Sequence, residues 1–484
     1  MLRQARASDS FGRATASCRG PPNAGRLPWR LRQTRPQKLR QTRPRKLRQT
    51  MPRKLRQTVR WTVQAGGELG APGLGHATVD HYCANPLLGL PAPKLPPSEL
   101  PEAGMEAGLL REGEAVLRLG DGFFRSESRP SRDLGVLLAR QLCRWGAQPA
   151  RLRVLDLMAG CGIRALRYGL ETDATEIWAN DADPDRLPAL QANLAVLAER
   201  GSISQLKALA LLAGCLQRQQ RFELVDLDAF GCPSALLPLA IEAVACPGVL
   251  YLASSDGRSP TGHDRRAAIR SLGASARAHP ASWELALRLQ LGSQARAAWA
   301  MGRGLEPLFS FSEGRTFRTA VRITRRPAPR EEEQLGLIAH CHGCGDQQVQ
   351  SLLKLGQWLP CCCPAGVSAA LAISGPLWIG PLQDPQLLAA MASDADNRPN
   401  SLGPGGRRLL AQLRADPGLP ARCWPTAEIG RRLGSGPPRL EALVSALRRQ
   451  GWASCGSGVM AGQLRSEAPW SVVLSSARGL AAAK

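Results

Sequence analysis

The residues best suited to chemistry are Asp228, Ala229, Phe230 and Gly231, which follow the largely apolar run 222–227. A run of this kind predicts a buried strand, so the Asp228 carboxylate should lie just beyond the end of that strand. A carboxylate followed by a small residue, an aromatic residue and a glycine can hold a planar exocyclic amine. The motif therefore predicts methyl transfer to a nucleobase nitrogen.

A second segment, 154–164, predicts a strand that runs into a glycine-rich loop. Asp156 lies near the end of the strand, and Gly160 and Gly162 would let the backbone approach a ligand at the N-terminus of the next helix. Asp181 follows the next predicted strand, where it could bind both ribose hydroxyls. The spacing of the glycines is shorter than Gly-x-Gly-x-x-Gly, which favours S-adenosylmethionine over NAD.

Each of these residues also has a purely structural interpretation. Asp156 or Asp181 could cap a helix, and the two glycines could serve only a tight turn. Asp228 could cap the predicted helix 234–244. The order of strand, glycines and second acid favours a nucleotide site, and capping does not account for Phe230.

The chemistry assigned to Asp228 follows from the weakness of the nucleophile. The lone pair of an exocyclic amine is delocalised into the base, and two acceptors for its N–H groups would localise that pair and aim it at the methyl group. We expect these acceptors to be the Asp228 carboxylate and the Ala229 carbonyl. Phe230 would stack on a base taken out of its own stack.

Strand-like and helical patterns alternate from about residue 112 to 324, which predicts a doubly wound, Rossmann-like α/β fold. The predicted strands are 154–157, 176–179, 224–227, 249–253 and 317–323, and the predicted helices include 163–169, 189–199 and 283–299. We assign residues 105–326 to this domain. Residues 327–484 would form a smaller α+β domain, with a Cys-rich segment and a winged-helix-like unit built on helices 427–433 and 439–450.

Residues 1–104 predict a disordered, basic and Pro-rich extension. An eight-residue repeat beginning Leu-Arg-Gln-Thr runs through 31–58, with a proline in each complete copy and almost nothing apolar to bury. The extension could be an electrostatic arm for RNA. We favour a low-complexity extension or a mis-assigned start, with Met105 as the alternative start.

Composition limits the remaining classes of function. The net charge of +24 is concentrated in residues 1–60, which hold 18 Lys and Arg and one Asp, so the rest of the chain is only mildly basic. No apolar run is long enough to span a membrane, and no secretory signal is evident. The 14 cysteines then predict reduced thiols in a cytoplasmic protein, some of which could bind metal.

Cys341 and Cys344 have the Cys-x-x-Cys spacing of a zinc knuckle. Cys361 and Cys363 could complete a four-thiolate site, with His340 or His342 as substitutes. The alternative is a site that has decayed.

The chain resembles the tRNA (guanine(26)-N(2))-dimethyltransferase family in many short motifs that occur in the same order along the sequence. They cover residues 112 to about 324 and, more loosely, the remainder. The segments that carry the resemblance are 123–124, 131–134, 155–168, 179–184, 226–231, 284–288, 302–310 and 375–382.

The resemblance implies S-adenosylmethionine-dependent methylation of guanine N2 in tRNA, at position 26, with mono- and then dimethylation. It implies that Arg132 binds the cofactor carboxylate and Arg164 lies beside the loop. It also implies that Asp181 holds the ribose, with Ala182 next to it, and that Asp228 is the catalytic acceptor. Without the resemblance, Arg132 would be interpreted as the salt-bridge partner of Asp133 or of another neighbour.

Two positions depart from the family pattern. The residue after the catalytic aspartate is usually proline, and here Ala229 keeps the carbonyl without the rigidity of the ring. Where the family tends to carry an acidic residue against adenine, this chain has Lys207 and Ala208, so we expect adenine contacts mainly from the backbone.

The expected partner is tRNA, and the sequence indicates neither a membrane nor a protein partner. Arginines that could follow a phosphate backbone lie at 258–277, 322–330, 431–432 and 448–449, although solvated helix faces look the same. The rival functions are methylation of guanine N2 in rRNA, methylation of adenine N6, and tRNA binding without catalysis.

Overall fold

The computed structural model describes residues 109–120, 124–144, 151–361, 363, 371–398 and 401–482. The predicted extension 1–104, with its repeat and Met105, lies outside the described residues, as does Phe123. Among the described helices, none combines the length and the apolar character that crossing a bilayer requires.

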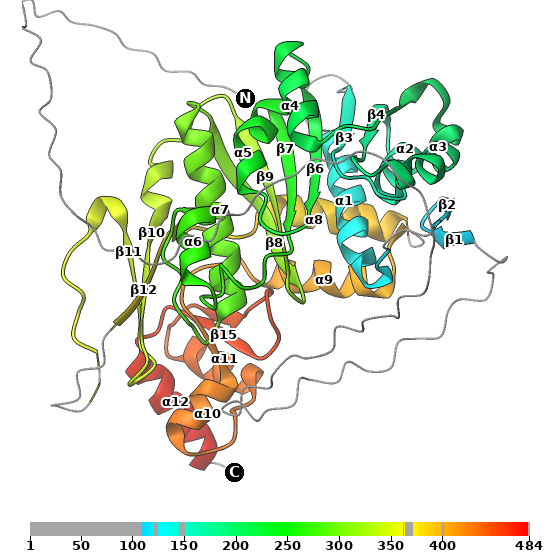
Figure 1. The fold of residues 1–484 in the computed structure, drawn as a ribbon. Helices are drawn as coiled ribbons and strands as arrows, with labels where there is room; N and C mark the ends of the chain where they lie inside the picture. The colour runs from blue at the N-terminus through cyan, green and yellow to red at the C-terminus, as the bar shows by residue number, and fades with distance from the viewer. Residues whose placement is uncertain are drawn as a thin grey trace, which may run out of the picture. The chain divides into compact units, whose positions relative to one another are not determined.

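A seven-stranded sheet forms the centre of the fold, with the strand order β5-β4-β3-β6-β7-β9-β8 (Figure 1). The first five strands in this order are parallel, and β9 runs antiparallel to both β7 and β8. The strands of the sheet are β3 (Leu152–Asp156), β4 (Ala174–Asn180), β5 (Gly201–Ser204), β6 (Phe222–Ala229), β7 (Val244–Ser254), β8 (Gly304–Glu313) and β9 (Thr316–Thr324). The predicted α/β fold is confirmed, and β5 and β8 are strands that the sequence patterns did not predict.

Two helical layers cover the sheet because successive strand residues point to opposite faces. Val154 and Leu224 pack into one core, whereas Leu155 and Val225 pack into the other. The helices of the chain are α1 (Arg129–Leu142), α2 (Ile163–Glu171), α3 (Leu187–Leu194), α4 (Ala208–Gln217), α5 (Leu237–Ala243), α6 (Arg265–Leu272), α7 (Ser282–Ala300), α8 (Pro385–Asn397), α9 (Pro404–Ala415), α10 (Thr426–Leu433), α11 (Leu440–Arg449) and α12 (Trp470–Ala482).

The first core joins α1, α2, α8 and α9 to the sheet, and the second joins α4, α5 and α7. The predicted single helix 189–199 is wrong in its extent. The α-helix α3 ends at Leu194, and a 3-10 helix follows in which Ala198 has a φ of 49°. The backbone therefore breaks the helical pattern where the sequence alone suggested continuity.

Three smaller sheets complete the described structure. A hairpin of β1 (Leu109–Glu112) and β2 (Ala115–Arg118) precedes α1. The other two sheets are β11-β10-β12, made of Gln347–Ser351, Leu335–Cys341 and Leu371–Trp378, and β13-β15-β14, made of Cys423–Pro425, Gln463–Ser466 and Ser454–Gly456. The predicted helices 427–433 and 439–450 correspond to α10 and α11, which pack with α12 around Trp424.

A buried ion network fixes these C-terminal elements to α7. Arg465 on β15 contacts both oxygens of Glu284 at 2.8 Å and Asp416 Oδ1 at 2.7 Å. All three side chains are buried. Burial alone would raise the pKa of Glu284, but Arg465 and Arg288 lower it to about 2. The network therefore keeps full charges inside the protein, which makes each partner necessary to the others.

We predict that Arg465→Met destabilises the protein by about 3–5 kcal/mol, because it leaves Glu284 and Asp416 buried without their partner. The free energy of unfolding from urea titration measures the effect. Arg449→Met, at an exposed position on α11, is the control and should change stability by less than about 0.5 kcal/mol. Equal stability of the two variants would contradict the prediction.

Candidate functional site

The predicted catalytic and cofactor segments meet at one edge of the sheet. β4, β3 and β6 are neighbours and parallel, so their carboxyl ends lie together. Asp156 on β3 is directly opposite Asp226 on β6, two residues before Asp228. Asp181 follows the last residue of β4. Segments far apart in the sequence thus place their acidic side chains around the same edge.

The glycine-rich loop has two glycines with different reasons for being there. Gly160 has a φ of 57°, and a Cβ added to it would meet no atom within 4 Å, so the backbone borders open space that a ligand can approach. Gly162 has a φ of 82°, and a Cβ there would lie 2.7 Å from Leu190 on α3. Gly160 therefore fits a cofactor loop, whereas Gly162 is explained by the close packing of α2 against α3.

Asp181 is held in place by the glycine-rich loop itself. Its Oδ2 accepts a 2.8 Å hydrogen bond from the Gly160 N–H, and its Oδ1 accepts one of 2.9 Å from the Asp183 N–H. Ala182, between them, is exposed. These contacts position the carboxylate beside the open space at Gly160, where the predicted role in ribose binding requires it.

Asp156 is fully buried and contacts α2 rather than open space. Its Oδ2 accepts a 3.2 Å hydrogen bond from the Ala165 N–H near the start of that helix. Burial, together with the neighbouring Asp226, raises the pKa of Asp156 well above the ordinary value. The structure thus gives Asp156 a part in positioning α2, and its predicted contact with the cofactor stays a prediction.

Two arginines hold the carboxylate of Asp228 by the same oxygen. Arg318 Nη2 lies 2.9 Å from Oδ2, and Arg164 Nη2 lies 3.2 Å from it. Oδ1 receives no hydrogen bond from the described residues, and 30% of the side chain is exposed. Burial alone would raise the pKa of Asp228, but Arg318 and Arg164 hold it well below its ordinary range. Asp228 therefore presents one ionised oxygen to a ligand.

Arg164 and Arg318 reach Asp228 from different elements. Arg164 is the second residue of α2 and also donates to Ser131 Oγ at 3.0 Å. Arg318 lies on β9, where its Nε donates to Glu313 at 3.0 Å, and its side chain is 3% exposed. The sequence patterns placed Arg164 beside the loop and did not identify Arg318. β9 also contains Arg322 and three threonines, so no feature of the sequence singled out Arg318.

The turn that carries Phe230 is fixed by the end of β7. Gly231, with a φ of 77°, donates to Ser255 Oγ at 2.7 Å, and its carbonyl accepts from Ser254 Oγ at 3.0 Å. Ala229 remains in the β6–β7 ladder opposite Ser254, with its side chain buried. These two bonds join the turn to the end of β7. Phe230 itself follows Ala229 in the chain and is 80% exposed.

Arg132 is buried in an ion pair with Glu112, a partner that the sequence did not identify. Its Nε donates to Glu112 Oε1 at 2.7 Å, and its guanidinium lies 4.9 Å from the centre of the Phe124 ring. Asp133, the alternative partner suggested by the sequence, instead accepts from Arg167 at 2.7 Å. Arg132 therefore has a structural partner in this conformation, and its role toward the cofactor carboxylate stays a prediction.

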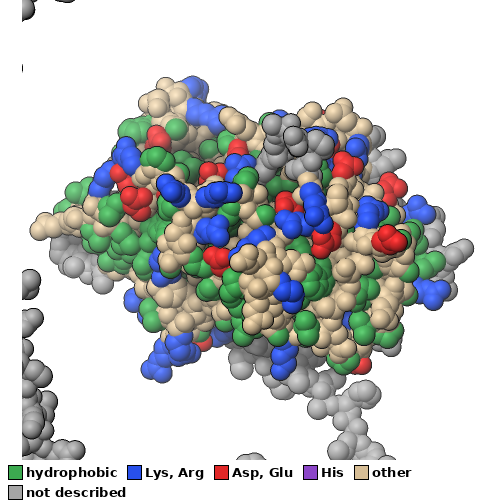
Figure 2. Space-filling view, turned by 90° about the horizontal axis from the view of Figure 1, so that it is seen from above, with side chains coloured by type: hydrophobic (Ala, Val, Ile, Leu, Met, Phe, Trp, Pro, Cys, Tyr) green, Lys and Arg blue, Asp and Glu red, His purple; other side chains and the backbone are tan. Residues whose placement is uncertain are grey.

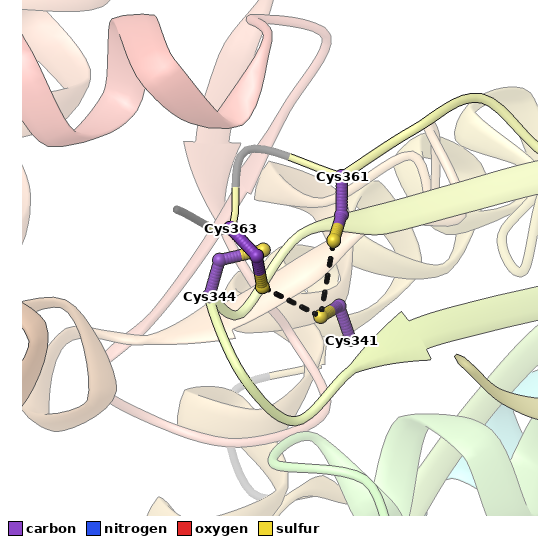
Figure 3. Close-up of side chains that lie close together, drawn as sticks. All are labelled: Cys341, Cys344, Cys361 and Cys363. Atoms are coloured by element: carbon purple, nitrogen blue, oxygen red, sulfur yellow. Dashed lines mark hydrogen bonds between the residues drawn. The ribbon is translucent and has the colours of Figure 1, made fainter. Parts of the chain in front are cut away.

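Cys341, Cys344, Cys361 and Cys363 form the predicted cluster, with all four sulfur atoms within 4.8 Å of one another (Figure 3). Cys341 Sγ lies 3.5 Å from the sulfur atoms of both Cys361 and Cys363. Tetrahedral zinc with Zn–S bonds of about 2.3 Å separates its sulfurs by about 3.8 Å. The cluster therefore fits a structural zinc ion, and its irregular spacing in the sequence does not prevent convergence in space.

We predict that the purified protein contains about one zinc ion per chain and that Cys344→Ser lowers this content, because three thiolates bind zinc less tightly than four. Elemental analysis after dialysis gives the measurement. Cys232→Ser, at a half-buried cysteine outside the cluster, is the matched control. Zinc content that is the same in both variants would rule out this site.

Comparison with known proteins places this arrangement in a family. Residues 111–478 match the family described as N2,N2-dimethylguanosine tRNA methyltransferase. The tRNA (guanine(26)-N(2))-dimethyltransferase of Methanoregula boonei is 29% identical over 365 residues, which cover 74% of this chain and 91% of that protein. The enzyme of the same description from Pyrococcus horikoshii is 26% identical over 337 residues, covering 66% and 84%.

A solved structure, the complex of Trm1 from Pyrococcus horikoshii with S-adenosyl-L-methionine, has the same fold. It superposes with a TM-score of 0.65 at 25% identity and covers 76% of this chain and 99% of its own. The family match extends over well more than half of the residues. The chain therefore belongs to the N2,N2-dimethylguanosine tRNA methyltransferase family.

Proposed function

We propose that this protein is an enzyme that transfers methyl groups from S-adenosylmethionine to the exocyclic N2 of guanine in tRNA, at position 26, first once and then a second time. The observation that carries the proposal is the partly exposed Asp228 carboxylate, which two arginines keep ionised, at the same sheet edge as the glycine-rich loop. The relatives act on guanine(26) in tRNA by their names. They give no support to methylation of rRNA or of adenine N6.

The chain's own residues bind and orient the nucleobase. Asp228 Oδ1 accepts an N–H of the guanine N2 amine, the Ala229 carbonyl accepts the other, and Phe230 stacks on the ring. When S-adenosylmethionine is bound, it supplies an electrophilic methyl group on a sulfonium. With both N–H groups held, the nitrogen lone pair is aimed at that methyl group.

The low pKa of Asp228 determines its role. A carboxylate paired with Arg164 and Arg318 is a good hydrogen-bond acceptor and a weak base, so it does not need to remove a proton before attack. The amine nitrogen forms the new N–C bond as the S–C bond breaks, and the surplus proton then leaves the nitrogen for solvent. The site therefore works by orientation and electrostatics rather than by prior deprotonation.

The cofactor site would be built from the glycine-rich loop and Asp181. The open space at Gly160 and the fixed Asp181 carboxylate support this assignment, with Ala182 at the exposed rim. Asp156 would act through the position of α2, and Arg132 would turn toward the cofactor carboxylate from its pair with Glu112.

We also propose the division into a methyltransferase domain, 105–326, and a tRNA-binding part, 327–484, in a cytoplasmic protein. Arg448 and Arg449 lie exposed at the end of α11, which suits contact with a phosphate backbone. Arg431, in contrast, is paired with Glu428 at 2.7 Å. The helix pair therefore offers only some of its arginines to RNA.

Mass spectrometry of nucleosides should detect N2-methylguanosine and N2,N2-dimethylguanosine in tRNA incubated with the protein and labelled cofactor. Asp228→Ala should lower the rate at least about 100-fold, because it removes the acceptor that orients the amine, while tRNA binding persists. Asp185→Ala, at an exposed aspartate, is the control. Failure of the wild-type protein to methylate bound tRNA would refute the enzyme proposal.

Arg318→Gln should change the pH dependence of methyl transfer. Loss of the guanidinium charge lets the pKa of Asp228 rise toward its ordinary value. As the pH is lowered, the variant should therefore lose activity at a higher pH than the wild type does. kcat should drop about 10-fold or more, with little change in the KM for the cofactor. Arg322→Gln, on the same strand and paired with Glu306, is the matched control. If kcat falls but activity is lost at the same low pH as in the wild type, Arg318 acts only on the fold.

A further inference from the structure

A hollow of 470 Å³ lies at the edge of the sheet opposite Asp228. Four neighbouring strands reach this edge. β6 and β7 begin here, and because β9 runs antiparallel to both β7 and β8, β9 ends and β8 begins beside them. Each arginine of the hollow flanks one of these strand ends. They are Arg221, Arg303, Arg325 and Arg326.

The positive charge of this hollow is only partly neutralised. Glu242 Oε2 lies 3.1 Å from Arg221 and 3.5 Å from Arg303. Arg303 also donates to Cys246 Sγ at 2.9 Å. Arg325 and Arg326 are exposed and make no ion pair with any residue that the structure describes. One carboxylate thus pairs with two of the four guanidinium groups, and the other two have no ion pair with a described residue.

Two other exposed arginines of the described chain have acidic partners of their own. Arg151 pairs with Glu176 at 3.3 Å, and Arg330 pairs with Glu333 at 2.8 Å. Figure 2 looks down on the face where β6 and β7 begin and shows Lys and Arg side chains close to one another, with acidic ones between them. The hollow differs from these pairs, because two of its four arginines have no acidic partner among the described residues.

We propose that this hollow binds phosphate groups. A guanidinium group can donate two parallel hydrogen bonds to two oxygens of one phosphate, and it stays charged at any physiological pH. The remaining lining residues are Val244, Ala245 and Cys246, which offer neither an aromatic face nor a side-chain amide to read a base. The hollow thus recognises phosphate rather than nucleobase.

The phosphates belong to the backbone of the substrate RNA, an assignment that rests on the proposed function. The strand β6 has eight residues between this edge and the catalytic edge, a span of about 25 Å. A contact here would engage a part of the RNA remote from the target base. It would strengthen binding without touching the reacting atoms, in the manner of phosphate contacts elsewhere.

The first test measures tRNA affinity as a function of salt for the wild type and for Arg325→Glu/Arg326→Glu. Each lost phosphate contact lowers the slope of log affinity against log salt by about one, so the double variant should lower it by about two. It should raise the KM for tRNA at least about 5-fold and leave kcat at saturating tRNA unchanged. Arg111→Glu/Arg118→Glu, on exposed positions of the β1–β2 hairpin, carries the same charge change as a control.

The second test uses inorganic pyrophosphate and calorimetry to separate the two sources of phosphate. Loss of pyrophosphate binding in the double variant, with tRNA binding unchanged, would assign the hollow to a free phosphate compound instead of RNA. If neither ligand distinguishes the double variant from the control, the phosphate site is wrong. Absence of methylation by the wild type, with the salt slope still altered in the variant, would reject the proposed function and leave the site standing.

Discussion

The catalytic edge depends on the way in which Arg164 and Arg318 hold Asp228 by a single carboxylate oxygen. A carboxylate at the end of a buried strand would otherwise tend to take up a proton, and a protonated Asp228 would be a poorer acceptor for an amine. Two guanidinium groups on Oδ2 keep the charge and leave Oδ1 for the ligand. The orientation of the side chain and its ionisation therefore have the same cause.

This constraint explains two features of the fold that lie away from Asp228, the start of α2 and the direction of β9. Arg164 can reach Asp228 only if α2 begins where it does, and Gly162 and Asp156 fix that start through packing on α3 and a hydrogen bond to Ala165. Arg318 can reach Asp228 only because β9 runs antiparallel beside β7, with Arg318 opposite Ala253. The antiparallel end of an otherwise parallel sheet thus supplies a residue to the site.

The charges beneath Asp228 also depend on these arginines. Burial raises the pKa of Asp226, although Arg164 lies 3.4 Å away and the hydroxyl of Tyr168 donates to it at 2.7 Å. Asp156, further from the arginines, has its pKa raised well above the ordinary value. The pKa of each of these two buried carboxyls is thus raised, whereas the two arginines lower the pKa of Asp228, so the most acidic of the three groups is the one with a partly exposed side chain.

Local sequence patterns predicted the features that local physics determines. The central strands, the glycine-rich loop and the cysteine pairs each follow from spacing over a few residues, and the structure contains them. Arg318 and Glu112 could not be found in this way, because their partners lie 90 and 20 residues away and only the strand order brings them together. The end of α3 was missed for a different reason, since Ala198 adopts a positive φ that its residue type does not suggest.

The same helices that form the site also anchor the C-terminal elements. Arg167 on α2 donates to the Ser401 carbonyl at 3.3 Å, Asp133 on α1 accepts from the Gly403 N–H at 3.0 Å, and Arg140 on α1 contacts Asp394 on α8 at 3.2 Å. Because these bonds are buried, they resist competition from water and keep their geometry. These bonds hold α8 and the residues just before α9 against α1 and α2, which carry Arg132 and Arg164. The site and the start of the C-terminal part thus share the same buried helices as their support, so a change in the packing of α1 or α2 would reach both.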